Sequence, residues 1–63
     1  MLWLSEVLIS GHELQSFTQL EKAVKDRAQQ GEMFFRMDVK PTFIDTPDNW
    51  EDRLEAAFTS ATK

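Results

Sequence analysis

Hydrophobic residues fall into four blocks along this chain, and each block has the spacing of one secondary-structure element. Residues 2–9 form a mostly apolar run, which is typical of a strand that is covered on both faces. Residues 14–30 carry apolar side chains three and four positions apart, the spacing of one helix face. Residues 32–43 alternate apolar and polar positions, as a half-buried strand does. A last helix is predicted with Thr46 as its N-cap and Pro47 at its first position.

Polar residues and a glycine mark the ends of the first predicted helix. Ser16 and Gln19 have the spacing of a capping box, while Ser10 and Glu13 offer an earlier start with the same spacing. Gly31 is suited to the C′ position, because glycine adopts the left-handed conformation that ends a helix. The sequence therefore fixes where this helix ends and leaves two positions for its start.

The order of strand, helix, strand and helix predicts a single β-α-β-α domain over residues 1–63. We expect an α/β protein of the small α+β type, with a two-stranded sheet packed by two helices. Two strands joined through a helix are usually parallel, because the crossover is right-handed. Such a sheet has two open edges, which proteins cover or use for pairing. The predicted core residues are Leu20, Val24, Phe35, Met37, Leu54 and Phe58.

A chain of 63 residues allows only a small core. Below about 70–80 residues, a single core rarely supplies more than ~3–5 kcal/mol of stability. There is no cysteine, which excludes disulfides and thiolate metal sites. Residues 1–9 contain Glu6 and are too short to cross a bilayer, and they lack the basic start of a signal peptide. We therefore expect a soluble, cytoplasmic protein with no membrane partner.

Acidic residues dominate the C-terminal part of the chain. The formal net charge is −4 at pH 7, and residues 45–55 hold five of the eleven acids. Negative charge repels phosphate, so we expect no direct binding to nucleic acid. Asp48 and Glu51 also suit the first turn of a helix, where the helix dipole favours each acid by ~0.3–1 kcal/mol. Asp45 is an alternative cap for that helix, and Arg53 is expected to pair locally.

The same acids also suggest a contact surface for a basic partner, with Trp50 in their midst. Phe34 is included because it lies on the charged side of its strand, where an aromatic side chain is exposed. Exposed aromatic residues are common interface anchors. The candidate partner-binding residues are Phe34, Asp45, Asp48, Trp50, Glu51, Asp52 and Glu55.

Catalytic and cofactor-binding patterns are missing from the sequence. His12 is the single histidine, and we expect it in a solvent-facing turn. Gly11 and Gly31 are isolated, so there is no phosphate-binding loop. The acids after Ile44 lack the spacing and the central glycine of an EF-hand. The sequence therefore predicts a protein that is not an enzyme and has no catalytic residues, no cofactor and no metal.

By composition, the chain resembles the small acidic proteins with which phages and mobile elements block host machinery, such as anti-CRISPR and anti-restriction proteins. The resemblance implies an inhibitor that acts as a DNA mimic and occupies the basic groove of a larger nucleic-acid-binding protein. Two alternatives remain open. One is a small dimeric transcriptional regulator or antitoxin-like module that touches nucleic acid through the cations of residues 22–40. The other is an accessory subunit that pairs through a sheet edge. Both a monomer and a homodimer fit the sequence.

Overall fold

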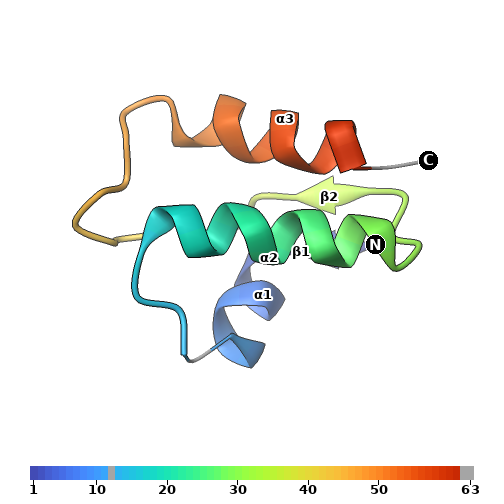
Figure 1. Ribbon diagram of the computed structural model, residues 1–63, viewed down its shortest axis with the longest axis horizontal. Helices are drawn as coiled ribbons and strands as arrows, with labels where there is room; N and C mark the ends of the chain where they lie inside the picture. Colours follow the sequence, from blue (N-terminus) through green and yellow to red (C-terminus); the bar gives the residue numbers. More distant parts are fainter. Residues whose placement is uncertain (12, 62–63) are drawn as a thin grey trace.

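A computed structural model, which describes residues 1–11 and 13–61, shows a small α+β fold (Figure 1). In chain order the elements are β1 (Leu2–Trp3), α1 (Leu4–Ser10), α2 (Phe17–Gln29), β2 (Phe35–Arg36) and α3 (Trp50–Ala61). The strands β1 and β2 pair in parallel. The helices α2 and α3 lie side by side and make the most extensive contact between any two elements. The predicted fold class and the parallel two-stranded sheet are confirmed, while a third helix was not predicted.

The first element differs from its prediction. The strand predicted over residues 2–9 is wrong beyond Trp3, because the chain turns into α1 at Leu4. Leu4 and Val7 are buried on the inner face of this helix. A short apolar run fits a buried strand and a buried helix equally well, so its periodicity does not decide between them. In this chain, tertiary contacts decide in favour of the helix.

One of those contacts comes from far along the chain. The N-cap residue of α1, Trp3, offers no side-chain acceptor to the first turn of the helix. Asp38 supplies one instead, since its carboxylate accepts hydrogen bonds from the Ser5 main-chain N–H at 3.1 Å and from the Ser5 hydroxyl at 2.7 Å. The first N–H groups of a helix lack partners within the helix, so this carboxylate stabilises the start of α1.

The start and the end of α2 agree with the prediction. Ser16 is its N-cap and accepts a hydrogen bond from the Gln19 N–H at 3.2 Å. The Gln19 side chain in turn accepts the Gln15 N–H at 2.7 Å. At the other end, Gly31 has φ +112°, the left-handed region that glycine tolerates best. The later of the two predicted starts is therefore the correct one.

The second strand and the third helix are shorter than predicted. Only Phe35 and Arg36 of residues 32–43 form a strand. Thr46 does not cap α3, because its hydroxyl accepts the Phe43 N–H at 3.0 Å while its own N–H donates to the Phe43 carbonyl at 3.1 Å. Thr46 therefore closes a turn, and α3 begins four residues later at Trp50.

The core lies between the sheet and the helices. Among the predicted core residues, Leu20, Val24 and Leu54 are fully buried and Phe58 is 7% exposed. Phe35 and Met37 are only partly buried and pack against this core. The Phe35 ring stacks on the Phe58 ring with 5.2 Å between centroids, which joins β2 to α3. The further core residues are Leu2, Leu4, Val7, Phe17 and Ala28.

Replacing Leu54 with alanine tests this core. Leu54 is fully buried, and truncating a buried leucine costs about 2–5 kcal/mol. That range reaches most of the ~3–5 kcal/mol available to so small a domain. We expect Leu54→Ala to be largely unfolded, or to unfold at much lower urea, when followed by circular dichroism. Ile44→Ala is the control, because Ile44 is fully exposed. Equal unfolding midpoints for the two variants would show that the burial pattern is wrong.

Candidate partner-binding surface

Four exposed carboxylates surround the N-terminal half of α3, and we call them the α3 acidic surface: Asp48, Glu51, Asp52 and Glu55. Asp48 lies just before the helix, and the other three lie within its first two turns. Glu51 and Glu55 are four residues apart and Asp52 and Glu55 are three apart, so their side chains are neighbours on the helix surface. The predicted acids at these positions are thus brought together by the helix.

The opposite flank of α3 faces α2. Arg53, Ala56 and Ser60 line a shallow depression between the two helices, together with Glu21 and Lys25 of α2. Because each residue of a helix advances by about 100°, the side chains of residues 51 and 55 lie on the other flank, and that of residue 52 points outward. The α3 acidic surface therefore faces solvent, away from α2.

No ion pair neutralises these four carboxylates within residues 1–11 and 13–61. The acids that do form ion pairs there are Glu6, Glu21 and Glu32. Uncompensated like charges on one side of a helix produce a negative potential over that side. The surface is therefore suited to a positively charged partner.

Asp45 has a different position from the other predicted acids. Its Oδ1 accepts the Phe17 N–H at 2.7 Å, across 28 positions of the sequence. This hydrogen bond holds the pKa of the Asp45 carboxyl below its usual range, with smaller contributions from the Thr18 N–H and from the charge of Arg53. Asp45 thus caps α2 and not α3. Its carboxylate serves the fold, which corrects the prediction that it caps the last helix.

Arg53 joins the two long helices and pairs with an acid that lies outside its own helix. Its Nε and Nη2 donate to Glu21 Oε2 at 3.2 Å and to Glu21 Oε1 at 2.8 Å. Its guanidinium carbon lies 5.3 Å from the centre of the Phe17 ring, which suits a cation–π contact. The predicted local pairing of Arg53 is therefore wrong. Because the cation binds Glu21, it leaves the neighbouring acids of α3 uncompensated.

The two aromatic residues of the predicted site differ in their surroundings. Trp50 is half-buried and packs against the core at the start of α3. Phe34 is 65% exposed. Its neighbour Phe35 stacks on Phe58 of α3, so strand alternation directs Phe34 to the opposite side. The predicted site thus separates into the α3 acidic surface and a second surface at Phe34.

Sequence reasoning missed one member of this second surface. The alternating pattern of residues 32–43 puts Met33 on the same face as Phe35 and Met37, yet Met33 is 77% exposed. Met33 lies just before β2 and is not among the residues that pack against the core. The neighbouring Phe34, which was expected to be exposed, was the one indication in the sequence that this segment has an exposed apolar surface.

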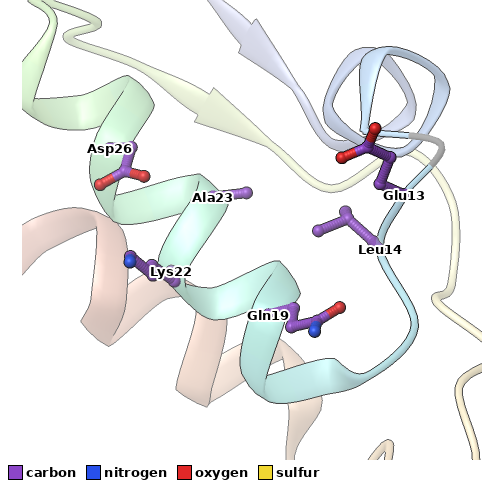
Figure 2. A pocket seen from close by; sticks show the side chains of 6 residues that line it. All are labelled: Glu13, Leu14, Gln19, Lys22, Ala23 and Asp26. Carbon is purple, nitrogen blue, oxygen red and sulfur yellow. The ribbon is translucent and has the colours of Figure 1, made fainter.

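A shallow depression lies between α2 and the segment that precedes it (Figure 2). It has a volume of about 360 Å³ and its lining residues are Glu13, Leu14, Gln19, Lys22, Ala23 and Asp26. The Gln19 amide oxygen is already bound to the Gln15 N–H. The described lining residues are ordinary for a helix surface, and none of them carries a hydroxyl or imidazole group.

His12, predicted in a solvent-facing turn, lies outside the described residues. In the described part of the chain, no three His, Cys, Asp or Glu side chains come together as a metal site would require. No helix there is long and apolar enough to span a bilayer. Comparison of the chain with family models, with curated proteins and with solved structures found no match.

The two aspartate caps predict how stability depends on pH. Hydrogen bonds to Ser5 and to Phe17 lower the pKa of Asp38 and of Asp45, respectively, below the ordinary value of 3.8. A carboxyl with a lowered pKa in the folded state stabilises the fold above its unfolded-state pKa, and this contribution disappears as the pH falls through the folded-state pKa. Below about pH 4, we expect the wild type to unfold at a lower urea concentration than it does at neutral pH.

The variant Asp38→Asn/Asp45→Asn should be less stable at neutral pH and should lose less stability on acidification. The control is Asp52→Asn, which removes a charge from the α3 acidic surface and leaves both caps intact. Its stability should depend on pH as that of the wild type does. An equally steep acid loss in the double variant would show that these caps do not control acid unfolding.

Proposed function

We propose that this chain is a non-catalytic, cytoplasmic inhibitor that binds a larger protein through the α3 acidic surface. The partner is a nucleic-acid-binding protein, and the surface occupies its basic groove in place of the phosphates. This is the mode of action of phage- and mobile-element-encoded inhibitors of the anti-CRISPR and anti-restriction type. The observation that carries the proposal is the group of four exposed carboxylates on α3, which no ion pair neutralises within the described residues.

The support given to α3 favours this proposal. Leu54, Ala57 and Phe58 anchor the helix in the core, and Arg53 ties it to Glu21 of α2. Side chains on a supported helix keep their spacing, so less conformational entropy is lost when a partner binds. The carboxylates are therefore presented at spacings fixed by the helix.

The cations of the chain give weaker support to direct nucleic-acid binding. Arg53 is bound to Glu21, and Arg27 lies 4.0 Å from Glu6. The remaining described cations, including Arg36 and Lys40, belong to a chain whose net charge is −4. Binding to a phosphate backbone needs several concentrated positive charges. The inhibitor proposal therefore accounts for more of the surface than the regulator alternative does.

Charge reversal on the outer side of α3 tests the proposal. Proteins captured from a host lysate by the immobilised wild type are identified, and their affinity is then measured with purified protein at several salt concentrations. Asp52→Lys/Glu55→Lys should slow association about tenfold at low salt and flatten its salt dependence, because surface charges steer the encounter. The captured protein should also lose its nucleic acid when the wild type is added.

A matched control changes the net charge by the same amount on another surface. Glu13→Lys/Asp26→Lys reverses two exposed acids in and before α2, and it should retain clearly more affinity than the α3 variant. Unchanged affinity of Asp52→Lys/Glu55→Lys would refute the role of α3. The regulator alternative would instead be favoured if the wild type shifted duplex DNA in a gel and the variant Arg36→Ala/Lys40→Ala did not.

A further inference from the structure

The segment around β2 has a strand pattern that extends beyond the part that pairs. Residues 32–40 alternate apolar and polar positions, yet only Phe35 and Arg36 form β2. Met33 and Phe34, just before β2, are 77% and 65% exposed. An open strand edge is a template for a further strand. The edge of β2 that faces away from β1 is therefore a candidate for pairing.

The register of the sheet shows which main-chain groups lie on this edge. The Leu2 N–H donates to the Phe34 carbonyl at 2.7 Å, and Leu2 lies opposite Phe35. In a parallel ladder, the N–H and C=O groups of residues 34 and 36 then face β1, while those of Met33 and Phe35 face the other side. Within the described chain, no main-chain hydrogen bond reaches those groups of Met33 and Phe35. They are free to pair with another strand.

We propose that this edge binds the same edge of a second copy of the chain, antiparallel and about a two-fold axis at Phe34. Met33 of one copy then lies opposite Phe35 of the other. These two residues have outward-facing N–H and C=O groups, so they form the hydrogen-bonded pairs of an antiparallel ladder. The result is a continuous sheet in the order β1-β2-β2-β1. This inference does not depend on the function proposed above.

Charge complementarity identifies the second copy as the occupant. Glu32 and Arg36 are each two positions from Phe34, so the two-fold axis places Glu32 of each copy opposite Arg36 of the other. Arg36 is exposed and has no ion pair among the described residues. Glu32 has one buried oxygen without a hydrogen bond, 3.8 Å from the Met1 amino group. A guanidinium from the second copy supplies donors to the other oxygen of the Glu32 carboxylate.

Neighbouring registers are less favourable. An axis at Met37 places Arg36 opposite Asp38, whose two oxygens are already bound at the start of α1. An axis at Arg36 sets two guanidinium groups against each other, and an axis at Phe35 sets two acids against each other. Like charges directly opposite one another destabilise an antiparallel pair. The axis at Phe34 pairs opposite charges and leaves the cap of α1 intact.

The same axis covers the exposed aromatic residue. The two Phe34 residues form a non-hydrogen-bonded pair, in which the Cα atoms of an antiparallel ladder approach to about 4.5 Å. Aromatic side chains directly opposite in such a pair contact each other and lose exposure to water. The pairing therefore gives Phe34, otherwise 65% exposed, a contact.

Charge reversal and charge exchange test the dimer in sedimentation-velocity experiments over a range of concentrations of the full chain. The wild type should form a dimer. Arg36→Glu and Glu32→Arg should each weaken dimerisation about tenfold or more, because each change acts twice across the axis. The exchange variant Glu32→Arg/Arg36→Glu should restore it, because both ion pairs form again in reverse. Lys40→Glu is the control, because Lys40 is an exposed cation that has no oppositely charged counterpart in this register. Circular dichroism verifies that each variant is folded.

A single cysteine tests the register. The chain has none of its own, so Phe34→Cys introduces the one thiol. Non-hydrogen-bonded pairs bring Cβ atoms within reach of a disulfide, so mild oxidation should link two Phe34→Cys chains much faster than two Lys40→Cys chains. A wild type that stays monomeric at all concentrations, a dimer unaffected by Arg36→Glu, or equal cross-linking of both cysteine variants would overturn the proposal. A monomer that instead pairs its edge with a strand of another protein would also overturn it.

Discussion

Helix N-termini need acceptors for their first N–H groups, and this fold meets that need with carboxylates from a distant segment. Asp38 binds Ser5 across 33 positions, and Asp45 binds Phe17 across 28 positions. Both aspartates belong to the long connection between β2 and α3, which has little regular structure of its own. The two contacts attach this connection to α1 and α2. The path of the chain into α3 follows from them.

This use of carboxylates decides which acids remain available to a partner. Asp38 and Asp45 act within the fold, and Glu21 binds Arg53. Arg53 in turn contacts the ring of Phe17, whose N–H is bound by Asp45. Charges that compensate one another thus gather where α2 and α3 meet. The acids of the α3 acidic surface lie outside this network, and this is the reason that the surface is negative.

Patterns in the sequence correctly predicted those features of the fold that local interactions determine. The cap at Ser16, the end of α2 at Gly31 and the burial of Leu54 follow from spacing and from backbone preferences, and they are confirmed. The start of α1 depends on Asp38, which no pattern within the first ten residues reveals. The position of Asp45 depends in the same way on a helix that precedes it by 28 residues. Long-range hydrogen bonds therefore account for the main errors in the fold and in the site.

The arrangement of faces around β2 relates the two proposed surfaces to each other. Phe35 stacks on Phe58 of α3, and strand alternation turns Phe34 to the other side of the sheet. Pairing at the β2 edge about Phe34 uses the edge and that outer side, whereas Asp52 of the α3 acidic surface points outward from α3. Pairing of this kind joins two acidic surfaces in one particle. Two linked surfaces raise the effective concentration at a partner that offers two basic sites, provided that the spacing of those sites matches. Under the two proposals together, a dimer would bind an extended or repeated basic groove more tightly than a monomer would bind a single one.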